Sequence, residues 1–320
     1  MEFVVEKNCY NIDAVEELTP YIKPFLDRVL SAYKIPSLDY FVVADSRDES
    51  FAETIIRYSA VVGTESYITQ DGVYFVAGKS LDGIDHDGNL HQAIVIKSSI
   101  WVCAAYEYLG SQGQLKDDIL KQMNTPSFMS LALILHEIGH AVDNEHQFRI
   151  SGTVNTKLGY DLEYEYEEYA KYNALSLWGE YYAESFAYMA IQSNEDLTID
   201  KQLELEKCIA TYSFGIDRDV LMARAYRILY LFVIRTAFVH QSSNFSKTFN
   251  YEKFMAEEAL VPYVPILAKT EIAIIKLYRK YPYWDSYEQL AELSEVFKEF
   301  VAFEYRRQIH SNPTHPGSAE

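Results

Sequence analysis

Strand-like patterning is confined to the first third of this chain. Three runs rich in β-branched and aromatic residues, LDYFVVADS, GVYFVAGKS and LHQAIVIKSSIWV, all lie between residues 38 and 102. Later in the chain, the apolar residues recur with the spacing of helices. Because so few strands form only a small sheet, helices must supply most of the core. The pattern predicts an α/β (α+β) fold with a small twisted sheet and a mostly helical C-terminal part.

The same spacing predicts where individual elements lie. Two helices should end near residues 35 and 63, the second at Gly63, and an acidic connector, LDGIDHDGN, should separate the last two strands. The segment TPSFMSLALILHEIGHAVDNE predicts a long helix, with Thr125 as its cap and Pro126 in its first turn. Residues 160–172 predict an acidic, solvated helix or loop. Further helices are predicted within residues 173–193, 201–214, 218–239, 251–260, 269–281 and 286–309.

The composition narrows the class of protein. The 320 residues are 49% hydrophobic and carry a net charge of -19. This suits a globular chain and disfavours nucleic acid as a partner, because an acidic surface repels phosphate backbones. Cys9, Cys103 and Cys208 are too few and too far apart for a disulfide framework. With no signal peptide or membrane-spanning run recognised, we expect a cytoplasmic protein without a membrane partner. Export by a signal-less route, as a toxin or effector, stays open.

The segment HEIGH, residues 136–140, holds the clearest chemical signal. His136 and His140 are four residues apart, so a helix places both on one face, one turn apart. Their imidazole nitrogens can then take two corners of a tetrahedral zinc site. Glu137 lies beside that face, where it can take a proton from a water that the metal activates and later return it to a leaving amine. The motif predicts a metal-dependent hydrolase with Zn2+ as its cofactor.

Two residues compete to be the third ligand. His146 has the spacing of the H-E-x-x-H-x-x-G-x-x-H pattern of metzincins, but a helix that continued past His140 would carry it about 240° round the axis. Asp143 stands where that pattern has the glycine that breaks the helix. The alternative is Glu180, which with Glu184 presents two carboxylates on one face of a second helix. One of them could bind the metal while the other holds a ligand histidine through its far nitrogen. The pattern favours Glu180 and keeps His146 as the alternative.

The segments HEIGHAVDNE and EYYAESFAYM together resemble the catalytic core of the anthrax lethal factor family of zinc metallopeptidases. The resemblance covers roughly residues 70–192 at most. It implies a zincin-like core and leaves His146 outside the site. The roles that it implies are zinc ligands for His136, His140 and Glu180, general base for Glu137, and support of the ligands for Glu184 and Asp143.

The family also places a tyrosine hydroxyl near the metal, where it stabilises the oxyanion of the tetrahedral intermediate. That tyrosine stands seven residues before the ligand glutamate, a position that is Asn173 in this sequence. We therefore predict that Tyr172, one residue away, supplies this hydroxyl, with Tyr169 as the alternative.

The resemblance implies a zinc-dependent endopeptidase of the gluzincin class that acts on protein or peptide substrates. We expect a zincin-like catalytic domain over residues 1–195, a helical C-terminal subdomain over 196–310, and a disordered tail over 311–320. Two other functions stay open. One is a non-proteolytic zinc-binding interaction or regulatory protein, and the other is a metzincin-like peptidase with His146 as the third ligand.

Overall fold

The computed structural model describes residues 1–64, 77–115, 129–151, 166–191, 205–209, 217–241 and 260–311. By its internal contacts the chain divides into two compact units. Unit 1 comprises Met1–Tyr160 and Phe186–Ser193, and unit 2 comprises Asp161–Ser185 and Asn194–Glu320. The domain boundary predicted from the sequence falls after residue 195, whereas this division assigns residues 161–185 to unit 2. Nearly all of the predicted tail lies outside the described residues.

Unit 1 is built on a four-stranded sheet with the strand order β1-β2-β4-β3. β1, β2 and β4 run parallel, and β3 pairs antiparallel with β4 at one edge. The two central strands are nearly continuous runs of buried residues, as expected for parallel strands that are covered on both faces. The strands are β1 (Glu2–Val5), β2 (Leu38–Ala44), β3 (Gly78–Ile84) and β4 (Leu90–Lys97).

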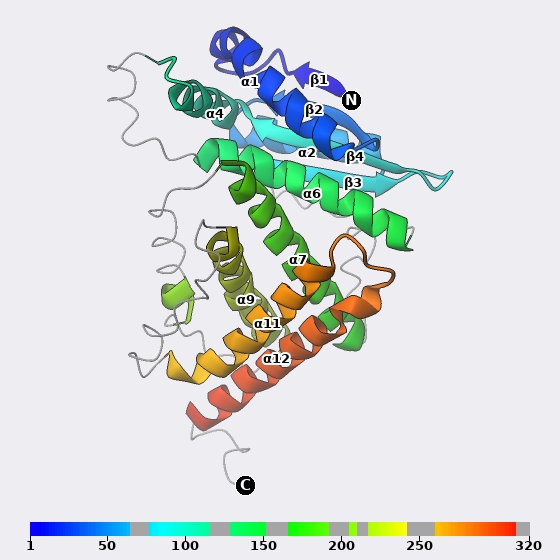
Figure 1. Ribbon diagram of the computed structural model, residues 1–320, viewed down its shortest axis with the longest axis vertical. Coiled ribbons are helices and arrows are strands. Elements are labelled where there is room, and N and C mark those ends of the chain that lie inside the picture. Colours follow the sequence, from blue (N-terminus) through cyan, green and yellow to red (C-terminus); the bar gives the residue numbers. More distant parts are fainter. Residues whose placement is uncertain are drawn as a thin grey trace. The chain divides into compact units, whose positions relative to one another are not determined.

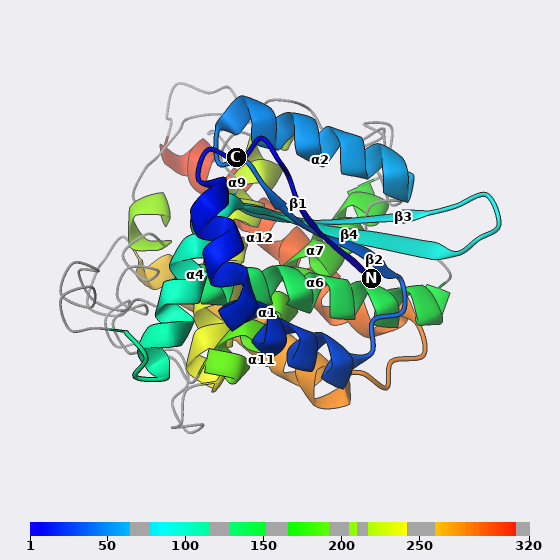
Figure 2. The same cartoon turned by 90° about the horizontal axis from the view of Figure 1, so that it is seen from above.

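Helices cover both faces of this sheet. Figure 2 shows α2 on one side of the strands and α1, α4 and α6 on the other. On the α2 side, Val42 belongs to the same buried cluster as Phe51 of the helix. On the other side, the Trp101 ring of α4 lies 5.8 Å from the Phe41 ring of β2. These helices are α1 (Ile12–Tyr33), α2 (Asp48–Val62), α4 (Ser98–Ser111) and α6 (Met129–Ser151).

Most of the elements predicted in unit 1 are confirmed, but β1 is not among the predicted strands and two elements are wrong in their limits. The predicted strand after residue 37 is β2, and α2 ends at Gly63, which takes the left-handed φ of 86° that glycine tolerates. β3 begins at Gly78 and includes LDGI, predicted here as connector, because pairing with β4 outweighs weak strand propensity. Residues 72–76 of that predicted strand lie outside the described residues.

The second error concerns residues 98–102, predicted as the end of a strand, which instead form the first turn of α4. The hydroxyl of Ser46 accepts a hydrogen bond from the backbone N–H of Ser99 at 2.7 Å and so satisfies one free donor of the new helix. A partner far away in the sequence therefore starts a helix where the local residues favour a strand.

α6 carries the HEIGH segment and lies along β3 and β4 (Figure 1). The predicted helix is confirmed from Met129 onward and continues to Ser151. Its first turn is capped from another helix, because the buried carboxylate of Glu107 accepts the backbone N–H groups of Ser130 (3.2 Å) and Leu131 (2.8 Å). The predicted cap and first-turn proline, residues 125 and 126, lie outside the described residues.

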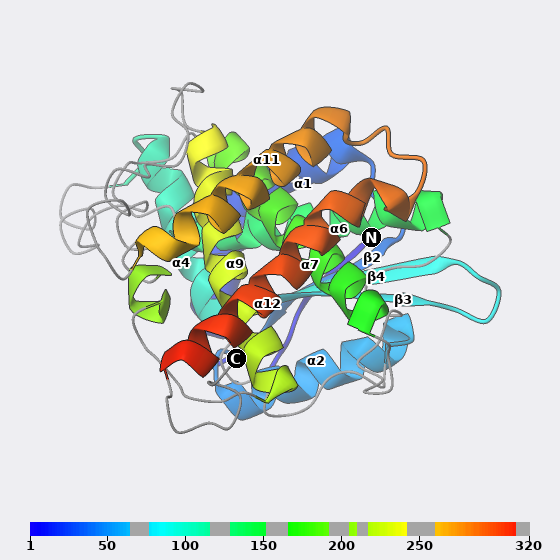
Figure 3. The same cartoon turned by 90° about the horizontal axis from the view of Figure 1, so that it is seen from below.

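Unit 2 is helical, as predicted for the C-terminal part. Helices α9, α11 and α12 pack against one another (Figure 3). The buried Arg224 of α9 donates to the carboxylate of Glu304 on α12 at 2.8 Å and to the carbonyl of Ile209 at 3.0 Å. The elements are α7 (Tyr166–Ile191), α9 (Arg218–Gln241), η2 (Val261–Tyr263), α11 (Val264–Lys280), η3 (Tyr287–Leu290) and α12 (Ala291–Ser311).

Two further findings concern the described residues. None of the helices in these ranges is both long and apolar enough to cross a membrane. Cys9, Cys103 and Cys208 are all free thiols. Burial raises the pKa of Cys9 to about 11, which leaves this thiol largely unreactive.

Candidate metal centre

His136 and His140 face each other on one side of α6. Their Nε2 atoms are 3.0 Å apart, and their rings stand nearly perpendicular at 86° with centroids separated by 4.6 Å. Two Zn–N bonds of about 2.0–2.1 Å at a tetrahedral angle separate the nitrogens by about 3.3 Å. The pair therefore has the spacing that a shared metal ion requires, as the four-residue separation predicts.

His140 is held in the neutral form that binds metal. Burial, followed by the neighbouring His136 and Lys79, keeps the pKa of His140 well below its usual range. A neutral imidazole offers a lone pair to a cation, whereas a protonated one does not. The local environment of α6 thus favours metal binding over protonation at this residue.

Glu137 is nearly buried beside the histidine pair, with 9% of its surface exposed. Its Oε2 accepts a hydrogen bond from the backbone N–H of Ser80 on β3 at 2.6 Å. The predicted base is therefore fixed by the sheet edge rather than free in solvent.

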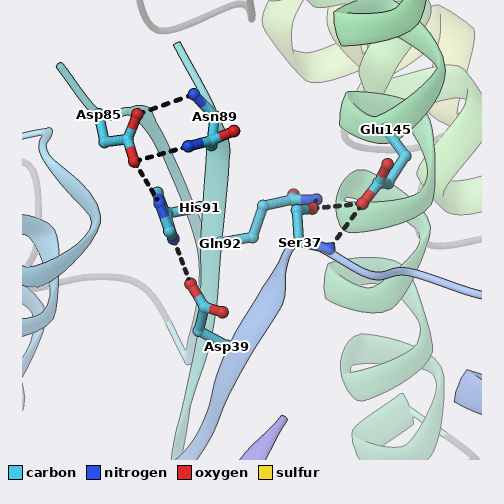
Figure 4. Close-up of polar contacts among 7 residues, drawn as sticks. All are labelled: Ser37, Asp39, Asp85, Asn89, His91, Gln92 and Glu145. Carbon is cyan, nitrogen blue, oxygen red and sulfur yellow. Dashed lines mark hydrogen bonds and ion pairs between the residues drawn. The ribbon is translucent and has the colours of Figure 1, made fainter. Parts of the chain in front are cut away.

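Polar contacts also fix the C-terminal half of α6 against the sheet (Figure 4). Glu145 accepts hydrogen bonds from both the backbone N–H (2.8 Å) and the hydroxyl of Ser37. The fully buried Gln92 of β4 donates its Nε2 to the hydroxyl of Ser37 (2.7 Å) and to the carbonyl of Ala141 (3.0 Å), and its Oε1 accepts from Asn144 (3.1 Å). These bonds hold the turn that follows His140 in one orientation.

Glu180 and Glu184 lie one turn apart on the same side of α7. Burial, and then the charges of Glu180 and Glu184, raise the pKa of Tyr230 on α9. One turn earlier on the two helices, the hydroxyls of Ser176 and Tyr226 are 2.8 Å apart. Tyrosines of α9 thus run along the acidic side of α7.

His136, His140 and Glu180 form a group that could hold a metal ion. One ligand atom from each residue lies within 4.8 Å of the other two, and all three residues are partly buried. α7 continues from unit 2 into unit 1, where Phe186 packs against Tyr33 of α1 with ring centroids 4.6 Å apart. Two histidines and one carboxylate are a donor set that catalytic zinc uses, with a fourth position left for water or substrate.

His146 lies on the same helix but is not a member of this group. α6 runs without a break from Met129 to Ser151, so the turn that a metzincin pattern requires after His140 does not form. Asp143, where that pattern has glycine, is helical and buried, and its carboxylate accepts a hydrogen bond from Gln147. The continuous helix therefore supports the choice of Glu180 over His146.

The predicted tyrosine positions all lie in the first turns of α7. Asn173 is buried and donates its side-chain amide to the carbonyl of Tyr169 at 2.8 Å, and Tyr169 itself packs on Phe297. Tyr172 is half-buried. Eight residues of helix turn Tyr172 about 80° away from the side that carries Glu180.

Sequence reasoning missed two neighbours of the predicted residues. Ser80 acts through its backbone N–H, which leaves no trace in the residue type, and it lies 57 positions before Glu137. Tyr230 lies in a long apolar helix whose pattern reads as core. A tyrosine repeated four residues apart, at Tyr226 and Tyr230, is the one signal in the sequence that could have indicated a polar side of α9.

Comparisons with known proteins add no relative. No family model matches the sequence, no curated protein matches it, and no solved structure matches the fold.

Proposed function

We propose that the chain is a zinc-dependent endopeptidase of the gluzincin class with a zincin-like core. One observation carries the proposal, namely the group of His136, His140 and Glu180 with Glu137 directly after the first histidine. Two histidines with a glutamate, next to a second glutamate that can move protons, are what metal-assisted hydrolysis needs.

The donor set fits a catalytic zinc better than a structural one. Structural zinc sites use four protein ligands and are usually rich in cysteine, whereas the group found among the described residues has three ligands and no cysteine. When bound, zinc polarises the substrate carbonyl and lowers the pKa of a water towards about 7.

The residues of this chain supply the rest of the reaction. Glu137 takes the proton of the attacking water and passes it to the leaving nitrogen, so that the C–N bond breaks with a neutral amine as the product. Tyr172 is the proposed donor to the developing oxyanion, and Tyr230 is a second candidate because it lies near Glu180 and Glu184. Comparison of kcat for Tyr172→Phe and Tyr230→Phe identifies which hydroxyl acts.

Replacement of the base tests the proposal. In Glu137→Ala, cleavage of a mixed peptide library should fall about 10²–10⁴-fold, because the proton acceptor is lost, while the zinc content stays that of the unmodified chain. Glu168→Ala, which removes an exposed acid from the first turn of α7, is the matched control and should cleave normally. Cleavage by the unmodified chain should stop when a chelator is added. A chain that binds zinc fully yet shows no chelator-sensitive cleavage would instead be a zinc-binding interaction protein.

A further inference from the structure

β3 is the antiparallel edge strand of the sheet, and one of its backbone donors is already in use. In the pairing with β4, Ser80 lies opposite Ile94. The N–H of Ser80 points away from β4, since it donates to Oε2 of Glu137 at 2.6 Å. An outward N–H on an edge strand has no partner in the sheet, so this contact satisfies a donor that would otherwise need water or another chain.

The side chain of Ser80 does not make this contact. Its Oγ is buried and has no hydrogen-bond partner within the described ranges. The strand therefore holds Glu137 by its backbone, and the geometry depends on where β3 lies relative to α6 rather than on the identity of residue 80.

Gly78 allows the two elements to approach this closely. A Cβ at this position would lie 2.7 Å from Cδ1 of Ile96, 2.9 Å from Cδ2 of Leu133 and 3.1 Å from Cγ of Glu137. A side chain at Gly78 would require the ends of the Ile96 and Leu133 side chains to move and Cγ of Glu137 to shift by a few tenths of an ångström. Glycine at this position therefore keeps β3 and α6 close together beside the base.

We propose that β3 is the positioning element for the base of the reaction, with the Ser80 N–H orienting Glu137 and Gly78 leaving room for it. This rests on the proposed function for its catalytic meaning, but the contact itself does not. With Oε2 fixed by the strand, Oε1 is the oxygen that is left to receive the proton of the attacking water. A carboxylate that is already fixed loses less orientational entropy when the reaction begins, and this raises kcat.

Amide hydrogen exchange tests the contact without reference to activity or metal. In the intact chain, the Ser80 amide should be protected although it lies on the outward side of an edge strand. Glu137→Ala should lower that protection about 10-fold or more, which is the equilibrium effect of losing one charge-assisted hydrogen bond. The Leu81 amide, which alternation points toward β4, should keep its protection and so show that the strand remains paired.

Kinetics test the positioning. Ser80→Pro removes the donor at an outward-facing edge position where proline is tolerated, and it should lower kcat about 10-fold or more with a smaller change in KM and an unchanged affinity for zinc. Ser80→Ala keeps the amide and should recover most of the kcat that Ser80→Pro loses.

The outcomes separate the two proposals. A Ser80 amide that exchanges freely in the intact chain, or a Ser80→Pro variant with full kcat, overturns the positioning role. A protected amide in a chain that cleaves no peptide leaves the contact standing and overturns the proposed function. If Ser80→Pro does not fold, the exchange measurement on Glu137→Ala still tests the contact. Unchanged protection of the Ser80 amide in that variant overturns the contact and, with it, the positioning role.

Discussion

The two helices that supply the metal group are held in place by different kinds of contact. α6 is fixed by hydrogen bonds that its first backbone N–H groups donate to Glu107, that Ser80 donates to Glu137, and that Gln92 donates to the carbonyl after the second histidine. The part of α7 that belongs to unit 2 also makes polar contacts, such as that of Ser176 with Tyr226 at 2.8 Å, but it adds a cluster of packed aromatic rings that α6 does not share in the described residues. Trp178 packs on Trp284 (4.6 Å between ring centroids) and on Tyr281 (5.1 Å).

The difference matters because hydrogen bonds and ring contacts constrain a helix differently. A hydrogen bond weakens steeply with distance and angle, so several of them fix both the position and the rotation of α6. Ring contacts contribute mostly buried area and keep much of their energy over a range of offsets. We therefore expect the histidine pair and the base to be set precisely, and Glu180 to depend on the bulk of the packing around it.

The largest effect on stability should come from the aromatic side of this comparison. Trp178 is fully buried in unit 2, and Trp178→Ala should lower the free energy of unfolding by about 3–5 kcal/mol because it leaves a large cavity. Chemical denaturation measures the change. Trp178→Phe, which keeps an aromatic ring, is the control and should lose clearly less. A loss below about 1 kcal/mol in Trp178→Ala would show that the rings do not hold α7.

The polar side should show a smaller loss of stability. Gln92→Ala should cost about 1–3 kcal/mol, because it leaves the buried carbonyl of Ala141 and the amide of Asn144 without their partner. The same denaturation experiment measures it. Gln92→Glu is a useful comparison, since it keeps the shape but removes the donor to Ala141. If Gln92→Ala is as stable as the unmodified chain, the hydrogen bonds of Gln92 to Ala141 and Asn144 do not constrain α6.

The smallest effect is a pH-dependent change in stability at His91 on β4, a strand that α6 packs against. His91 on β4 contacts Asp39 through Nδ1 (2.6 Å) and Asp85 through Nε2 (3.1 Å), with Asp85 also bonded to Asn89 (Figure 4). Hydrogen bonds that the His91 ring donates to Asp39 and then to Asp85 raise the pKa of His91. The stabilisation is thus fully present below the unfolded pKa of about 6.5 and is lost as pH rises through the higher folded pKa.

His91→Gln should accordingly lower Tm by about 1–2 °C at pH 5.5, a small value because all three side chains are partly exposed to solvent. At pH 9 the Tm difference should vanish, as thermal melts at both pH values can show. A difference of the same size at both pH values would mean that charge at His91 plays no part.

The sequence indicated those parts of the molecule whose signal is local. Gly63 ends α2 because glycine alone is relaxed at that φ, and the four-residue spacing of His136 and His140 brings their nitrogens together on any helix. The limits of β3 and α4 were predicted wrongly because they depend on partners far away in the sequence. Pairing with β4 makes a strand of LDGI, and a hydrogen bond to Ser46 starts a helix at SSIWV. The contact between Ser80 and Glu137 was not predicted for the same reason, since every residue except proline has a backbone N–H and the residue type therefore gives no sign of this donor.

The choice of the third ligand is the central claim, and zinc content tests it most directly. Glu180→Ala, His146→Ala and Glu184→Ala should be purified in parallel, equilibrated with limiting zinc, and measured for bound metal per chain by mass spectrometry. We predict that Glu180→Ala loses affinity by more than about 100-fold, that Glu184→Ala loses about 10–100-fold as expected of a supporting residue, and that His146→Ala binds zinc as the unmodified chain does. Full zinc binding by Glu180→Ala together with its loss in His146→Ala would contradict the site proposed here.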